Sequence, residues 1–220
     1  MNNAHLPVWY RQIATAMRQH IWLKAVATPL FIAVFFVVYL YLLKHPVYPT
    51  TIMPVTSLDS LIGFQPLAMP LYVSLWVYVS LPPALLSTRR ELLSYSTAMT
   101  ITCLTGLLIF YFWPTAVPAA HIDWALYPDV DYLKTIDSAG NAFPSLHVAT
   151  ATFSAIWLHF VLNRFGAPRW LLGLNFVWCV GILYSTLATR QHVVVDVLAG
   201  LVLGIVVAQL SLRTQIRSQT

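Results

Sequence analysis

Two histidines stand near the starts of two long apolar stretches in this chain, and the second is followed by a carboxylate. His147 opens one stretch, and His192 precedes Asp196 by four residues at the start of the last one. If a helix runs through this segment, the i, i+4 spacing puts His192 and Asp196 on one helix face. The carboxylate would then hold one imidazole nitrogen as N–H and leave the other as a nucleophile or a base. A snorkelling histidine beside a helix-capping aspartate is the alternative interpretation.

The segment before His147 predicts the start of a helix. Proline suits the first turn of a helix, so Pro144 is expected there, and Ser145 is expected to cap the helix or to bind an anion. The free N–H groups and the dipole of such a helix start favour a phosphate group. Gly140 and Asn141 just before it predict a tight, exposed turn.

Two cations near the histidines indicate an anionic substrate. Arg190 lies two residues before His192. It is predicted to bind phosphate, although a lone arginine at the end of a span is often only an interfacial anchor. Lys134 is a second candidate phosphate ligand, and a merely solvated side chain is its alternative.

Together these residues predict phosphoryl transfer without a metal ion or another cofactor. His192 would attack phosphorus, and Asp196 would orient and stabilise its ring. His147 would protonate the leaving oxygen and then activate the acceptor. Arg190, Ser145 and the amides of the helix start would neutralise the non-bridging oxygens.

The composition places this chemistry in a membrane. Hydrophobic residues make up 59% of the 220 residues and charged residues only 9%, whereas soluble domains have roughly 25% charged residues. The net charge of +5 does not indicate nucleic-acid binding, because the basic residues are spread between apolar runs. Cys103 and Cys179 fall within apolar runs and are expected to be inert core thiols.

The apolar runs predict an all-α bundle of transmembrane helices. A helix that spans a bilayer needs about 20 mostly apolar residues, and six segments qualify. We expect a single domain over residues 1–220, with an interfacial lead-in at residues 1–21. Pro70, Pro82 and Pro83 are expected to interrupt or end the second span. The predicted spans are 22–43, 65–87, 94–115, 146–164, 169–188 and 193–212.

The basic residues predict the orientation of the bundle. Nine of the twelve lysines and arginines lie in alternate gaps between spans, which by the positive-inside rule makes both termini cytoplasmic. The catalytic motifs lie in the segments 134–147 and 185–200, and the loop before His147 and the turn before His192 are then both outside. The expected location is a plasma membrane, such as a bacterial inner membrane. The nine residues are Arg11, Arg18, Lys24, Arg89, Arg90, Arg164, Arg169, Arg213 and Arg217.

Two segments of the chain resemble motifs of a known family. Phe143 to His147 and His192 to Gly200 are similar to motifs of the type 2 phosphatidic acid phosphatase superfamily, the lipid phosphate phosphatases. The order and spacing of the two motifs and the six-span layout extend the resemblance over most of residues 65–212. The resemblance implies the same roles for the two histidines and Asp196, a metal-independent mechanism and a lipid phosphate substrate.

The chain also departs from the family pattern. Leu146 stands where the second motif usually has glycine, and Thr186 stands where the third motif has its phosphate-binding arginine. The first motif, a lysine followed by Arg-Pro, is not found at its usual distance. Lys134 and Arg190 are the candidates to replace the missing cations. With these departures, the pattern is more similar to the branch of the superfamily that contains inositol phosphorylceramide synthase. That branch includes phosphotransferases.

The leading functional hypothesis is a lipid phosphatase that acts at the extracytoplasmic leaflet through a phosphohistidine intermediate. A lipid phosphotransferase that passes a phospho-headgroup to an alcohol is the first alternative. A non-enzymatic protein that binds haem through His147 and His192 is an alternative from another class. An intramembrane metalloprotease is disfavoured because the chain has no His-Glu-x-x-His sequence.

Overall fold

The computed structural model describes residues 8–119, 122, 127 and 140–217. Within these residues, six helices are long and apolar enough to cross a membrane, so the predicted all-α six-span fold is confirmed. Five of the spans are single helices, and the second is a composite of three. The single helices are α2 (Ile21–Lys44), α6 (Arg89–Phe112), α8 (Leu146–Arg164), α9 (Arg169–Ala188) and α10 (Val194–Arg217).

The second span is interrupted, as its prolines predicted, but the break is at Ser74 and not at a proline. It consists of a 3-10 turn η1 (Pro66–Ala68), α4 (Met69–Val73) and α5 (Leu75–Leu85), with Ser74 between the last two. Pro82 and Pro83 lie inside α5, where each removes one helical N–H donor, and the helix ends two residues after Pro83, at Leu85.

Short elements cover the ends of the bundle. The lead-in contains an amphipathic helix, α1 (Trp9–Arg18), which precedes α2. β1 (Thr51–Ile52) and β2 (Thr115–Ala116) form a two-residue parallel ladder, although no strand was expected from the sequence. The remaining element is the one-turn helix α3 (Ser57–Leu61).

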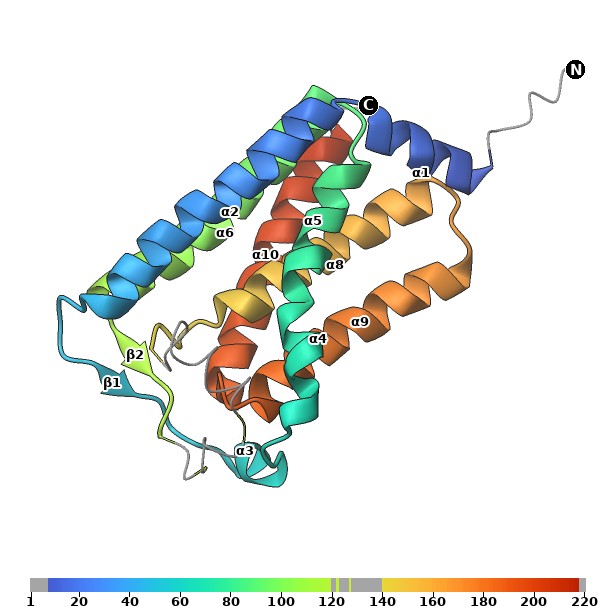
Figure 1. Cartoon of the computed structure of the whole chain (residues 1–220). Helices are drawn as coiled ribbons and strands as arrows, with labels where there is room; N and C mark the ends of the chain where they lie inside the picture. The colour runs from blue at the N-terminus through green and yellow to red at the C-terminus, as the bar shows by residue number, and fades with distance from the viewer. Residues whose placement is uncertain (1–7, 120–121, 123–126, 128–139, 218–220) are drawn as a thin grey trace, which may run out of the picture.

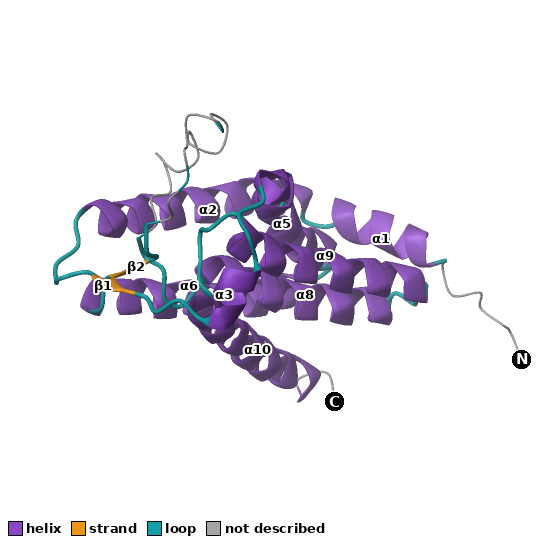
Figure 2. Ribbon diagram, turned by 90° about the horizontal axis from the view of Figure 1, so that it is seen from below, coloured by secondary structure: helices purple, strands orange, loops and turns teal. Residues whose placement is uncertain are grey.

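Both candidate motifs lie at one end of the bundle. In Figure 1, α3, β1 and β2 gather at the end where α8 and α10 begin. α1 and the last turns of α8 and α10 lie at the opposite end. The view from below in Figure 2 shows α2 along one side of the bundle, with α8 beneath α5. The fold therefore brings the segments of His147 and His192 to a common end.

The third span begins five residues before its predicted start. Thr88 and Glu91 form a capping box at the start of α6, with each side chain bonding the other residue's backbone N–H. Arg164, at the end of α8, forms an ion pair with Glu91. A hydrophobicity criterion does not include this charged first turn, but the cap and the ion pair make a helix start there stable.

α8 and α10, which carry the two motifs, pack very closely. A Cβ atom on Gly200 would collide with the carbonyl oxygen of Ser145, and one on Gly204 would lie 2.5 Å from the carbonyl oxygen of Ala149. The two glycines are four residues apart and face α8 together, as in helix pairs that associate in membranes through small residues. Two glycines thus fix the distance between the two candidate motifs.

Candidate active site

His192 lies in the turn before α10 and not in the helix. α10 begins at Val194, so the prediction that His192 and Asp196 share one helix face is wrong. The backbone N–H of His192 instead donates to the carbonyl oxygen of Thr186 at 3.1 Å. This bond fixes the turn against the end of α9, at the position where the family pattern has its arginine.

Asp196 is the third residue of α10 and is fully buried. Its Oδ2 accepts a hydrogen bond from the backbone N–H of Val193 at 3.1 Å, which is the return bond of a capping box. The same oxygen lies 3.6 Å from Nδ1 of His192. Neither Nδ1 of His192 nor Oδ1 of Asp196 has a hydrogen-bond partner in the described part of the chain. Asp196 therefore caps the helix and also places a carboxylate beside the imidazole.

A second buried carboxylate, Asp59, binds the same helix start. Its Oδ1 accepts from the backbone N–H of Val194 at 2.8 Å, and its Oδ2 accepts from the N–H and hydroxyl of Thr56, each at 2.7 Å. Only 2% of Asp59 is exposed. Negative charge at a helix N-terminus is stabilised by the free N–H groups and the dipole. Asp59 thus joins α3 to the turn that carries His192.

Arg190 stands in the left-handed region, with φ of 59°. Its Nη1 donates to the backbone oxygen of Asp59 at 3.0 Å, so the guanidinium is tied to α3 on one side. A guanidinium has five N–H donors, which leaves donors for another acceptor. Arg190 and Val194, which flank His192 in the chain, therefore both bind Asp59 and hold α3 in place.

His147 lies in the first turn of α8, as predicted. Its Nε2 is 3.1 Å from the carbonyl oxygen of Tyr72, and its ring stacks on the Tyr72 ring with centroids 4.0 Å apart. Because a carbonyl oxygen can only accept, Nε2 must carry the proton of this bond. Nδ1 is then the ring nitrogen of His147 that can give or take a proton.

Ser145 confirms the predicted cap, whereas Pro144 does not lie in the first turn. The hydroxyl of Ser145 accepts from the N–H of Val148 at 3.2 Å, and α8 begins at Leu146. Pro144 precedes the cap and follows a cis peptide bond. The N–H of Ser145 donates to the carbonyl oxygen of Asp196 at 3.0 Å. The starts of α8 and α10 are therefore bonded directly to each other.

The two histidines line one cleft. This cleft has a volume of about 640 Å³ and its walls are mostly apolar. Asn141 lines it beside them, in the left-handed conformation expected of a tight turn, but only 5% exposed where an exposed turn was predicted. Arg190 and Ser145 are not among the described residues that line the cleft.

Some predicted features fall outside what the structure describes or remain predictions. Lys134 lies outside the described residues. Within the described part, no three His, Cys, Asp or Glu side chains are grouped as metal ligands. The expectation that the reaction needs no metal stays a prediction.

Sequence reasoning missed Asp59 and Tyr72. Thr56 and Asp59 have the Thr-x-x-Asp spacing of a capping box, so the one-turn helix α3 could have been found. Nothing in the spacing indicates the bond from Asp59 to Val194, which is 135 residues away. Tyr72 contacts His147 through its backbone oxygen and its ring, and a tyrosine inside a predicted span has no distinctive pattern.

Comparison with known families agrees with this geometry. The model of the PAP2 superfamily matches residues 89–219, more than half of the chain and the part that contains both histidine motifs. No curated protein and no solved structure gives a significant match. α2, α3 and α5 lie before the matched residues. Because the match covers more than half of its length, this chain belongs to the PAP2 superfamily.

Proposed function

We propose that the protein is a membrane phosphatase that removes phosphate or diphosphate from a lipid through a phosphohistidine on His192. Members of the PAP2 superfamily are phosphatases that act on phosphate esters. The observation that carries the lipid assignment is the position of His147 and His192 on one mostly apolar cleft between membrane-spanning helices. A water-soluble ester would gain little from such walls, whereas a hydrocarbon chain matches them.

The first step forms a bond between His192 and phosphorus. Nδ1 of His192 faces Asp196 at 3.6 Å, so Nε2 is the proposed attacking nitrogen. The buried carboxylate stabilises the imidazole as it becomes positively charged. His147 enters this step as an imidazolium, with a proton on each ring nitrogen. The bond between phosphorus and the ester oxygen breaks, and this oxygen takes the proton from Nδ1 of His147.

The second step releases phosphate. Nδ1 of His147, now without its proton, takes a proton from water, and the water oxygen attacks phosphorus. The bond between phosphorus and Nε2 of His192 breaks, and the phosphate leaves. The hydrogen bond from His147 to Tyr72 supports these roles because it keeps Nε2 protonated and leaves Nδ1 for the exchange.

Phosphate binding is assigned to three groups. Arg190 has guanidinium donors beyond the one used for Asp59, and Lys134 is the second proposed cation. Ser145 contributes through the helix start that it caps, since N–H groups there favour anions. Such donors stabilise the negative charge on the non-bridging oxygens during both transfer steps.

The site is proposed to face the extracytoplasmic leaflet, with both termini in the cytoplasm. The distribution of basic residues supports this orientation. Transfer of the phospho-headgroup to an alcohol is the alternative reaction, and the replacement of the family arginine by Thr186 supports the phosphotransferase branch. The two reactions share the first step and differ only in the acceptor.

Lipid phosphates test the proposal directly. Wild-type protein, His192→Ala and His147→Ala would be incubated with phosphatidic acid and with a prenyl diphosphate, with and without a lipid alcohol. Free phosphate indicates hydrolysis, and a new phospholipid indicates transfer. His192→Ala is expected to lose at least about a thousandfold in kcat. His159→Ala, an exposed histidine on the same helix as His147, is the matched control. Full activity of His192→Ala would end the proposal.

A further inference from the structure

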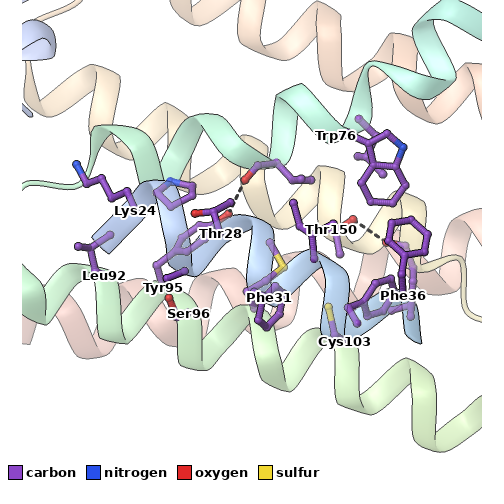
Figure 3. A pocket seen from close by; sticks show the side chains of 18 of the residues that line it. Lys24, Thr28, Phe31, Phe36, Trp76, Leu92, Tyr95, Ser96, Cys103 and Thr150 are labelled. Carbon is purple, nitrogen blue, oxygen red and sulfur yellow. Dashed lines mark hydrogen bonds between the residues drawn. The ribbon is translucent and has the colours of Figure 1, made fainter. Parts of the chain in front are cut away.

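The apolar cleft continues from the two histidines to the other end of the bundle. Its walls come from α2, α5, α6 and α8, and Figure 3 shows Thr150 and Trp76 at one end and Lys24 and Leu92 at the other. The lining extends from His20, the residue before α2, to Tyr39 within α2. At about 1.5 Å per residue this stretch is about 28 Å long, close to the roughly 30 Å of a bilayer's hydrocarbon core. The cleft therefore crosses most of the membrane.

The cleft has a polar far end. His20, Lys24 and Arg89 line it there, whereas the middle is lined by apolar and aromatic side chains. Nζ of Lys24 donates to the carbonyl oxygens of Ala16 at 2.7 Å and Ala84 at 2.9 Å. Lys24 thus ties α1 and α5 to α2 at this end. An apolar chain that reached this end would cover polar groups and remove them from water, which is costly.

Among the described residues, the side chains that line the middle of the cleft are mostly apolar or aromatic. Phe31 and Phe35 come from α2, Met99 and Cys103 from α6, and Val79 from α5. Cys103 and Met99 are themselves buried. A hydrocarbon chain matches this middle section, and the histidines at one end match the phosphate to which that chain is attached.

We propose that this cleft binds the hydrocarbon chain of the substrate lipid, with its phosphate at His147 and His192 and its end directed toward Lys24. The inference rests on the proposed function and adds that the enzyme measures chain length along the membrane normal. Chains that fill the apolar section are the preferred substrates, and shorter chains lose contacts with its deep part. The walls from α2 and α5 lie outside the residues that match the family.

Tryptophan substitutions at the deep end test the inference. Ser96 of α6 lines the cleft near Lys24, and Ser96→Trp would block the deep section without touching the histidines. Thr97→Trp is the matched control, because Thr97 is exposed and is not among the cleft-lining residues. Thr28→Trp repeats the block from the opposite wall on α2, with the exposed Val26→Trp as its control.

The substrates are straight-chain alkyl monophosphates from hexyl to octadecyl phosphate in one detergent. In the wild type, kcat/KM is expected to rise with chain length. Ser96→Trp and Thr28→Trp are expected to lower kcat/KM for octadecyl phosphate by about tenfold and to leave hexyl phosphate unchanged. Thr97→Trp and Val26→Trp are expected to follow the wild type. A melting temperature within the range of the controls shows that each blocked variant is folded.

The possible results separate this inference from the proposed function. If the wild type hydrolyses all chain lengths equally, or if the blocked variants lose activity equally on every chain, the phosphatase stands and the chain-binding cleft is wrong. Unchanged kinetics in both blocked variants would also overturn it. If the wild type hydrolyses no alkyl or lipid phosphate, the proposed function fails and the inference fails with it.

Discussion

The carboxylate of Asp59 accepts a hydrogen bond from the backbone N–H of Val194 at 2.8 Å, so a short helix between the first two spans holds the start of the last one. Val194 lies between His192 and Asp196 in the chain. The bond and the two that Asp59 receives from Thr56 are formed by a side chain that is 2% exposed. Asp59 is therefore proposed to position the nucleophile without touching the substrate.

Replacement of Asp59 is predicted to slow turnover. Asp59→Ala removes hydrogen bonds to a charged acceptor, each worth roughly 1.5–3 kcal/mol, and frees the turn that carries His192. We expect kcat to fall by about tenfold or more at temperatures well below melting, with little change in KM. Ser60→Ala, a change at the exposed neighbour, is the control. An unchanged kcat in folded Asp59→Ala would show that the link only stabilises the fold.

The negative charge of Asp196 and its helix-capping hydrogen bond can be tested separately. Asp196→Asn keeps an oxygen that can accept from Val193, but it removes the negative charge beside His192. We expect kcat to fall by about a hundredfold or more, because the imidazolium of the intermediate loses its stabilising partner. The loss of a cap alone costs only about 1 kcal/mol of stability. Nearly full kcat in Asp196→Asn would mean that Asp196 serves the helix and not the reaction.

Because α8 packs closely against α10, adding a single methyl group at this contact is predicted to lower the melting temperature. Gly200→Ala puts a Cβ onto the carbonyl oxygen of Ser145, and overpacking typically costs 1–3 kcal/mol. A lower melting temperature is expected, together with lower activity, because this contact lies between the two motifs. Gly173→Ala on α9 is the control, since nothing lies within 4 Å of its added Cβ. Equal melting temperatures for the two variants would contradict the tight contact.

The orientation of the protein in the membrane can be determined by labelling two introduced cysteines. Leu61 is 79% exposed at the end of α3, near the histidines, and Asn163 is exposed at the opposite end, near the end of α8. In intact cells, a membrane-impermeant maleimide is expected to label Leu61→Cys. Asn163→Cys is expected to react only after permeabilisation. The native Cys103 and Cys179 are buried and serve as the background. The reverse labelling pattern would invert the proposed topology.

The sequence predicts the membrane architecture well because it depends on length and polarity. A bilayer requires apolar runs of a set length, and all six predicted spans correspond to helices in the described part. The errors lie where polar groups are satisfied by partners. The third span begins at Arg89 because Thr88 and Arg164 accommodate the charge of Glu91, and a hydrophobicity criterion excludes these residues.

The site was only partly predictable for a related reason. His147 and His192 stand out because ionisable side chains are rare in spans. Their surroundings depend on contacts between distant segments, such as Asp59 with Val194 and His147 with the backbone of Tyr72. Such backbone bonds have no local pattern in a single sequence. The i, i+4 spacing of His192 and Asp196 suggested a shared helix face, yet the same spacing also fits a turn capped by the aspartate, which is what the structure contains.

The most direct test of the account is to trap the phosphorylated enzyme. Wild-type protein would be mixed with a lipid phosphate substrate carrying labelled phosphorus, denatured in alkali within the first turnovers, and digested for mass spectrometry. The proposed mechanism predicts a label that is stable in alkali, labile in acid and located on His192, and no label in His192→Ala. Steady turnover with no phosphohistidine, or with label on another residue, would contradict it.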